Sequence, residues 1–488
     1  MPRFYITTAI VYTNADPHIG FALELVQADA IARYRRMMGD DVRFCTGTDE
    51  HGSSVMRAAQ KAGKPTNEFV DGIAARVREL AERLHVSNTD FVRTSDQVRH
   101  WPAAQKLWSK LADRGDLYKK KYEGAYCIGH EAFIKPSELV DGLCPLHKTK
   151  PEIVQEENWF FRLTRYTPAI RELISSDALN IVPASRKTEL LNLLDDAEDV
   201  SFSRPSAQLP WGIPVPGDAT QTMYVWVDAL SNYLSALGYG TDGAGMDYWP
   251  AQVHLVGKDI TRFHAIIWPA ILLSAGLEVP KAIYIHGFIT VDGQKMSKTL
   301  GNVINPFELL DSWNADVVRY FLLRELQSTE DSDFSWKNLK GRYISDLANG
   351  LGNLVQRTTT LAEATQGGTV NLATDGDELA AVLDDEAYHQ AFRQFRLHDV
   401  AAHIWDKIGI ANAFLNVTEP WKREGEERTR IMGTVLSMLS HIAWLLDPLM
   451  PTTAQQIAVQ LGVARTRVPS GISKVHKAVP LFPREPRS

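Results

Sequence analysis

Two short stretches of the 488-residue chain carry residues suited to handling phosphate groups. In the sequence Pro-His-Ile-Gly-Phe, His18 stands at an expected helix N-terminus, where exposed amides and the helix dipole favour anions. Gly20 would let a nucleotide approach the backbone closely. Far downstream, Lys295 and Lys298 flank Ser297 in a glycine-bounded loop that could close over a triphosphate and neutralise charge as pyrophosphate leaves. Each stretch alone is more typical of a helix cap or a solvated turn, but the pair predicts a nucleotide site.

Two Cys-x-x-His pairs lie in the middle of the chain, Cys127 with His130 and Cys144 with His147. Thiolates and imidazoles at this spacing suit tetrahedral zinc, and four protein ligands would make the ion structural. The pattern therefore predicts one structural Zn²⁺, with buried thiols and surface histidines as the open alternative. The only other cysteine is Cys45, and so small and odd a count is typical of a reducing compartment, so we expect a cytoplasmic protein.

The elements around these residues follow the pattern of a doubly wound parallel sheet. A strand, a helix and a strand occur in turn near the N-terminus, and the same order returns after about residue 250. The expected strands are at 4–10, 42–46, 253–256 and 282–286. The expected helices are one with Asp16 as its cap and Pro17 in its first turn, ended by Gly39, and one over 259–274. Since the carboxyl ends of parallel strands share one edge, the sequence predicts a Rossmann-like α/β domain with its ligands at that edge.

The two α/β halves are separated by a stretch that breaks the alternation and is interpreted as an inserted domain. Beyond residue 325 long amphipathic patterns predict an all-helical bundle. The expected divisions are 1–114 for the first half of the catalytic domain, 115–221 for the inserted domain with the cysteine pairs, 222–325 for the second half, 326–345 for a linker and 346–488 for the helical domain.

The composition, 44% hydrophobic and 23% charged, is that of a globular protein and argues against disorder or a coiled coil as the main architecture. A formal net charge of −7 removes the simplest argument for a nucleic-acid binder, although the lysines at 119–121 and the basic C-terminal tail could form local patches. No export signal or membrane span is visible in the sequence. We therefore expect an enzyme-sized soluble protein.

Together the two phosphate motifs resemble the HIGH and KMSKS signatures of class I aminoacyl-tRNA synthetases. Further phrases, such as Thr-Gly-Thr-Asp-Glu-His-Gly at 46–52, resemble the methionyl-tRNA synthetase family over about residues 4–450. The resemblance implies L-methionine, ATP with Mg²⁺, and methionine tRNA with a CAU anticodon as substrates. It implies His18, Lys295 and Lys298 as catalytic residues and His18, Gly20, Lys295, Ser297 and Lys298 as the ATP site.

The resemblance also implies an apolar, aromatic methionine pocket, with Asp49 as the acid for the substrate ammonium group. Contact with aromatic rings stabilises an unbranched, polarizable thioether such as the methionine side chain. The other implied pocket residues are Ile10, Tyr12, Trp226, Ala229, Tyr233, Ile260, His264 and Trp268. In the helical domain Asn353, Arg357 and Trp421 match the anticodon readers of the family, where a tryptophan stacks on an unpaired base. A Trp421 packed between helices and an Asn353 that caps a helix are the structural alternative.

Two other functions remain open from the sequence. One is a nucleotidyltransferase of the same superfamily, which shares both phosphate motifs. The other is a paralogue that binds tRNA without activating an amino acid, because Phe21 replaces the usual polar residue that ends the HIGH signature. No additional C-terminal β-domain of the kind that dimerises some relatives follows the expected bundle, and we therefore expect a monomer.

Overall fold

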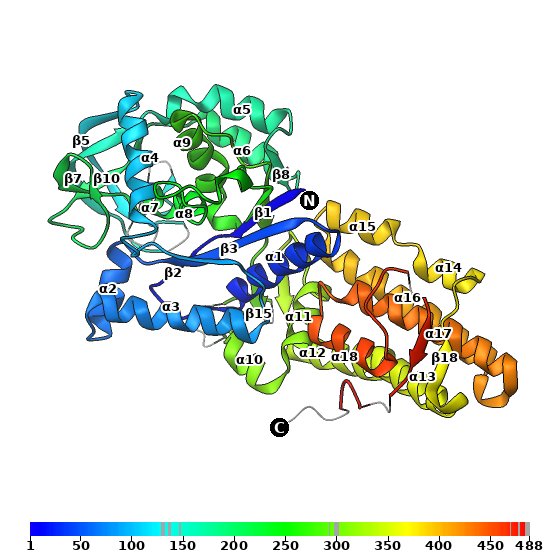
Figure 1. Cartoon of the computed structure of the whole chain (residues 1–488). Coiled ribbons are helices and arrows are strands. Elements are labelled where there is room, and N and C mark those ends of the chain that lie inside the picture. The colour runs from blue at the N-terminus through cyan, green and yellow to red at the C-terminus, as the bar shows by residue number, and fades with distance from the viewer. Residues whose placement is uncertain are drawn as a thin grey trace. The chain divides into compact units, whose positions relative to one another are not determined.

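The computed structural model describes residues 1–127, 132–134, 138–145, 148–291, 293–296, 302–468, 470–476 and 479–483. The chain divides into two compact units, and each is described by itself. The first unit comprises residues 1–17, 39–80 and 88–286, and the second comprises 18–38, 81–87 and 287–488. Figure 1 labels helices of both units and some of their strands.

A seven-stranded parallel sheet forms the centre of the first unit. Its order is β2-β3-β1-β13-β14-β8, and β4 pairs with β3. Ile6 pairs with Phe44 on one side and with Val253 on the other, so the two distant α/β halves meet in one sheet as predicted. The strands are β1 Arg3–Thr8, β2 Val11–Tyr12, β3 Asp41–Asp49, β4 Asp90–Arg93, β8 Asn180–Val182, β13 Val253–Gly257 and β14 Ala282–His286.

The segment between the two halves is mostly antiparallel. It forms a four-stranded sheet, β6-β5-β7-β9, and a three-stranded sheet, β10-β12-β11. One of its strands, β8, instead joins the central sheet beside β14. The sequence did not predict this, because a strand of three residues is too short to show a periodicity. The other strands are β5 Leu117–Cys127, β6 Ala132–Ile134, β7 Glu152–Phe161, β9 Val200–Ser201, β10 Ser203–Pro205, β11 Pro214–Val215 and β12 Asp218–Met223.

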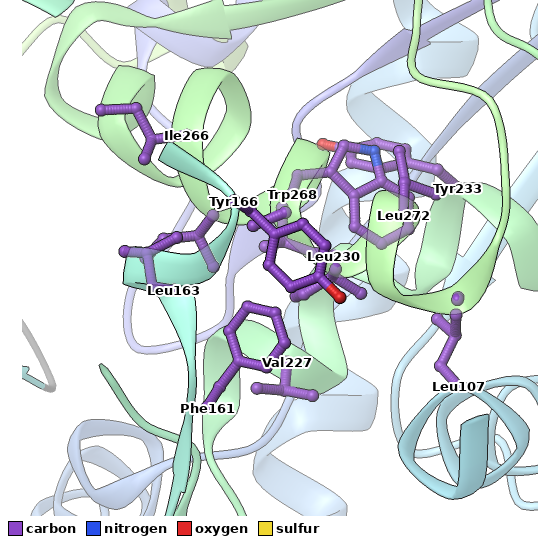
Figure 2. Packing of buried hydrophobic residues seen from close by; sticks show 14 of the residues in the cluster. Leu107, Phe161, Leu163, Tyr166, Val227, Leu230, Tyr233, Ile266, Trp268 and Leu272 are labelled. Atoms are coloured by element: carbon purple, nitrogen blue, oxygen red, sulfur yellow. The ribbon is translucent and has the colours of Figure 1, made fainter. Parts of the chain in front are cut away.

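Short helices cover the core of the first unit. They are α2 Ser53–Lys61, α4 Trp101–Asp113, α5 Thr167–Ser175, α6 Arg186–Asp195, α7 Val225–Leu230, α8 Asn232–Ser235 and α9 Trp268–Ala275, while α3 Thr66–Arg83 crosses the division between the units. Helix α4 contacts both α8 and α9. Figure 2 shows Trp268, Tyr233 and Leu272 in this apolar core.

The helix expected at 259–274 is divided into three types of turn. A 3₁₀ turn covers Lys258–Ile260, a π-helix covers Phe263–Ile267, and only then does α9 begin. Pro269 lies where the pattern changes, and it has no N–H to donate to an α-helical hydrogen bond. The wider π turn sets the positions of the side chains from Phe263 to Trp268.

Helices dominate the second unit, as predicted for its C-terminal part. Helix α16 contacts α11, α15 and α17, and α17 also contacts α14 and α18. Two small sheets, β16-β15-β17 and β18-β19, complete the unit. The elements are α1 Ile19–Met37, β15 Ile289–Val291, β16 Gln294–Lys295, α10 Pro306–Ser312, α11 Ala315–Arg324, β17 Ser332–Phe334, α12 Trp336–Arg342, the π-helix Tyr343–Gly352, α13 Asn353–Glu363, β18 Thr369–Asn371, α14 Asp377–Leu383, α15 Glu386–Arg393, α16 Leu397–Thr418, α17 Gly425–Leu446, α18 Pro451–Leu461 and β19 Ile472–Lys474.

Helix α17 is long and apolar enough to cross a membrane by length and composition. Within the described residues, however, 89% of its most apolar window is buried by the rest of the protein. A helix that is hydrophobic all round and covered by α14, α16 and α18 is the core helix of a bundle.

A buried ion pair fixes α1 within the second unit. The Arg319 guanidinium lies 2.7 Å from the Asp29 carboxylate, and both side chains are fully buried. Arg319 also donates to the carbonyl oxygens of Leu84, Pro448 and Leu449. Burial alone would raise the pKa of Asp29, but the neighbouring guanidinium groups outweigh it and the pKa is lowered. This pairing joins α1 and α11 to the turn that follows α17.

A Gly47→Ala substitution tests how closely β3 and β4 approach. A Cβ atom at residue 47 would lie 2.0 Å from the Val92 carbonyl oxygen, which is backbone and cannot turn away. We expect a loss of unfolding free energy of about 3 kcal/mol or more, the upper range for overpacking. The control is Gly72→Ala in α3, where nothing lies within 4 Å, and it should stabilise the protein by up to about 1 kcal/mol. Chemical denaturation measures both, and equal effects would contradict the close approach.

Candidate functional site

Asp49 and Tyr12 lie side by side at the carboxyl edge of the central sheet. Asp49 ends β3, and Tyr12 in β2 pairs with it in the parallel register. Thr13 secures this pairing, because its N–H and its hydroxyl both donate to the Asp49 carbonyl oxygen, at 2.9 and 3.0 Å. Ile10 lies half-buried in the link between β1 and β2. Three of the predicted methionine-pocket residues are thus brought to one edge.

Tyr233, His264 and Trp268 form a buried aromatic cluster in the same unit. The Tyr233 hydroxyl donates to His264 Nε2 at 2.6 Å, and His264 Nδ1–H donates to the Ile260 carbonyl oxygen at 3.0 Å. Burial lowers the pKa of His264 to about 4, so the imidazole is neutral at physiological pH. The cluster therefore presents aromatic surface and satisfied polar atoms without a formal charge.

Trp226, Tyr12 and Ile260 are only partly buried and pack against the same core. The Trp226 ring stacks on Phe263, with centroids 3.8 Å apart and planes within 5°. Ala229 is buried one turn after Trp226 in α7. The sequence missed Phe263 as a neighbour of this group, although it stands between two predicted pocket residues, because the π turn that carries it was not predicted.

A buried carboxylate between two histidines lies next to these residues in the sequence. Asp228 accepts from His51 Nδ1 at 2.6 Å and from His100 Nε2 at 2.7 Å. Burial alone would raise the pKa of Asp228, but the two imidazoles outweigh it and the pKa is lowered. Asp228 thus joins α7 to the segment after Asp49 and to the start of α4. His100 and His51 are separated from Asp228 by 128 and 177 positions in the chain, and no pattern in the sequence signals these contacts.

His18 is the N-cap of α1 in the second unit. Its exposed side chain accepts a hydrogen bond at Nδ1 from the Gly20 N–H, at 3.0 Å. The proton of the neutral ring is therefore on Nε2, which can donate to an anion. A Cβ atom at residue 20 would lie 2.9 Å from the imidazole, so glycine permits this ring position. His18 thus lies at a helix N-terminus, and its contact with phosphate stays a prediction.

The lysine loop is described only in part. Lys295 ends β16, which pairs with β15, while its side chain and the predicted residues Ser297 and Lys298 lie outside the described residues. The Asp333 carboxylate binds the segment that leads into the loop. It accepts hydrogen bonds from the Gly293 N–H at 2.8 Å and from the Thr290 hydroxyl at 2.7 Å. Sequence reasoning missed Asp333, which lies 40 residues from the glycine it holds.

Arg357 and Trp421 lie together in the helical bundle. The guanidinium carbon of Arg357 is 5.3 Å from the Trp421 ring centre, within cation–π range, and its Nη2 donates to Asn416 Oδ1 at 3.0 Å. Trp421 is 43% exposed, so the alternative in which it packs between helices is wrong. Asn353 is exposed one turn before Arg357 at the start of α13.

Comparison with known proteins identifies a family that this chain resembles in sequence and in structure. The model for class I tRNA synthetases (M) matches residues 4–148 and 131–359. The methionine–tRNA ligase of Thermotoga maritima is 40% identical over 471 residues, covering 93% of this chain and 74% of that protein. That of Brucella suis is 40% identical over 477 residues, covering 94% and 92%.

This chain belongs to the methionyl-tRNA synthetase family. Solved structures agree with the assignment. A Mycobacterium tuberculosis methionyl-tRNA synthetase in complex with methionyl-adenylate has a TM-score of 0.93 at 37% identity, covering 99% of this chain and all of that one. The apo form of that enzyme has a TM-score of 0.87 at 34% identity, covering 100% and 99%. Membership of the methionyl-tRNA synthetase family removes the alternative of another nucleotidyltransferase.

The structure describes two of the four predicted zinc ligands, Cys127 and Cys144. Cys127 and Cys144 are buried in one small cluster with Ile134, and neither forms a disulfide. The Lys148 N–H donates to the Cys144 carbonyl oxygen, and the Cys144 N–H donates to the Thr149 carbonyl oxygen. His130 and His147 lie outside the described residues. Two thiols in one cluster fit a zinc site, and the described residues contain no group of three or more metal-ligating side chains.

Proposed function

We propose that this chain is a methionine–tRNA ligase. It would convert L-methionine and ATP with Mg²⁺ into methionyl-adenylate and pyrophosphate, and then transfer the methionyl group to the terminal adenosine of methionine tRNA. The observation that carries the proposal is the uncharged aromatic group around Tyr233, His264 and Trp268, beside the sheet edge that holds Asp49. Family membership supplies the reaction type.

The methionine side chain would lie against the aromatic group. Sulfur–ring contacts contribute roughly 0.3–1.5 kcal/mol each, and a thioether has no hydrogen to donate to the neutral His264. A charged histidine at this position would favour a polar ligand, and burial prevents that charge. We assign Asp49 to the substrate ammonium group, and the half-exposed Ile10, Tyr12, Trp226 and Ile260, with Ala229, to the remaining contacts.

Adenylate formation needs positioning and charge stabilisation rather than a protein nucleophile. An oxygen of the methionine carboxylate attacks the α-phosphorus of ATP, and the bond from that phosphorus to the departing pyrophosphate breaks. We assign His18 Nε2–H to a phosphate oxygen and Gly20 to the close approach of the nucleotide to the backbone. Lys295, Ser297 and Lys298 would neutralise the negative charge that builds up on the leaving group.

The observation about Phe21 favours the active enzyme over a tRNA-binding paralogue. The side chain of Phe21 is 5% exposed and is therefore buried. The change from the usual polar residue therefore acts on packing, while His18 and Gly20 keep their hydrogen bond at the start of α1.

Recognition of the tRNA anticodon is assigned to Asn353, Arg357 and Trp421. An exposed tryptophan beside an arginine offers a stacking face and donors for unpaired bases such as those of CAU. We further propose that the protein acts as a monomer in the cytoplasm and holds one structural Zn²⁺ at Cys127, His130, Cys144 and His147. Zinc bound there would join the two Cys-x-x-His pairs.

The activation step can be measured without tRNA. We expect methionine-dependent exchange of labelled pyrophosphate into ATP, and Lys298→Ala should lower kcat by about 100-fold or more, the scale for losing a preorganised charge. The control Lys337→Ala removes an exposed lysine of α12 and should leave exchange unchanged. Absence of methionine-dependent exchange in the natural sequence would reject the proposed function.

Metal analysis of the purified protein tests the zinc site. We expect about one zinc per chain, because two thiolates and two imidazoles complete a tetrahedral structural site. A double Cys127→Ser, Cys144→Ser variant should lose the metal, whereas Cys45→Ala should keep it. A protein that is metal-free yet fully folded and active would refute the assignment.

The tRNA-recognition residues can be separated from activation. Stacking on an aromatic side chain is worth roughly 1–3 kcal/mol per base, so Trp421→Ala should lower kcat/KM for charging by about 5- to 150-fold. Pyrophosphate exchange without tRNA should barely change. Trp336, 48% exposed on α12, supplies a matched control, since Trp336→Ala should affect neither reaction. Equal losses of exchange and charging in Trp421→Ala would exclude it from the anticodon site.

A further inference from the structure

His254 is a fully buried histidine at the centre of the parallel sheet. It stands in β13, between β1 and β14. Its Nδ1 lies 2.7 Å from the Thr7 hydroxyl oxygen on β1. Its Nε2 accepts a hydrogen bond of 3.2 Å from the indole N–H of Trp268. Both ring nitrogens are therefore used, and one of them holds a predicted methionine-pocket residue.

The same imidazole supports a second pocket residue by stacking. The rings of His254 and Tyr233 have centroids 4.2 Å apart and planes inclined by 28°. Tyr233 and Trp268 contact each other with centroids 6.0 Å apart, and Figure 2 shows the two side chains packed together. The hydroxyl group of Tyr233 is also held, because it donates a hydrogen bond to His264.

The chemistry of this contact requires the neutral ring. Since Nε2 accepts from Trp268, the single proton of the imidazole is on Nδ1 and is donated to Thr7. Burial lowers the pKa of His254 well below its usual value, and the neighbouring His264 lowers it further, so this form persists at physiological pH. A side chain without ring nitrogens would leave the Trp268 N–H buried with no acceptor from residue 254.

We propose that His254 is a positioning residue for methionine binding: through one hydrogen bond and one stacking contact it fixes the orientations of Trp268 and Tyr233. The inference rests on the proposed function, which places these two rings against the substrate side chain. His254 itself has no role in the chemical step. Losing it should therefore weaken methionine binding and leave the ATP site unaffected.

The test measures steady-state pyrophosphate exchange by the full chain, with methionine and ATP varied in turn. His254→Phe keeps a flat ring but removes both nitrogens. We expect the KM for methionine to rise about 10-fold, the loss associated with one unsatisfied buried donor, and the KM for ATP to stay unchanged. His254→Gln retains an acceptor and should recover part of the loss.

His441 is a matched control for the general cost of losing a buried histidine. It is fully buried in α17, and its ring nitrogens contact the Arg467 carbonyl oxygen at 2.6 Å and Asp385 at 2.9 Å. His441→Phe should lower the thermal midpoint while leaving the KM for methionine unchanged. If His254→Phe behaves in the same way, or raises both KM values equally, the positioning role is overturned.

Thr7→Val keeps the test decisive if His254→Phe fails to fold. This substitution preserves the shape of the side chain and removes only the partner of Nδ1. We expect a smaller rise of the KM for methionine, again with no change for ATP, and an unchanged methionine KM in a folded Thr7→Val protein would then reject the proposal. A natural sequence without methionine-dependent exchange would instead reject the proposed function, before any variant is compared.

Discussion

The parallel register of β1, β3, β13 and β14 is the constraint on which the candidate methionine site depends. Residues 12, 49 and 264 are far apart in the chain, and only the shared carboxyl edge brings the segments after β1, β3 and β13 together. Gly47 shows how tight this sheet is, because even a methyl group there meets the backbone of β4. A one-residue slip would turn the side chains after each strand to the opposite face.

Burial then determines the charge of the polar groups beneath the site. His254 and His264 are kept neutral, because an imidazolium would lose its hydration without gaining a carboxylate of its own. Asp228 shows the opposite outcome under the same burial, because two imidazoles donate to it and its pKa is lowered. An uncharged, internally satisfied surface suits a thioether, whereas the single carboxylate predicted to face the substrate, Asp49, lies at the sheet edge.

The sequence predicted the helices and strands that show a periodic pattern of apolar residues. It missed features that depend on contacts between residues far apart in the chain. The strand 282–286 and the helix that precedes Gly39 follow from periodicity, and both are confirmed. The predicted start of that helix is wrong, because His18 rather than Asp16 is the N-cap and the helix begins at Ile19. The union of β8 with the central sheet, the π turn at Phe263 and the partners of Asp228 and His254 were not predicted. Apart from the π turn, which lies next to Pro269, each depends on contacts between residues that no local pattern relates. The pocket and anticodon residues came from resemblance, and their roles remain predictions.

Two tryptophan side chains in different units are each held by a neighbouring side chain, one in buried and one in exposed surroundings. Trp268 donates to a buried histidine, and Trp421 lies under an arginine that is itself bound to Asn416. Holding a ring in one orientation before a ligand arrives lowers the ordering cost of binding. At the exposed Trp421, water can replace the lost partner, so the arginine contributes modestly. At Trp268 water has no access, and the acceptor cannot be replaced. The buried contact should therefore be the more sensitive of the two to substitution of the supporting residue.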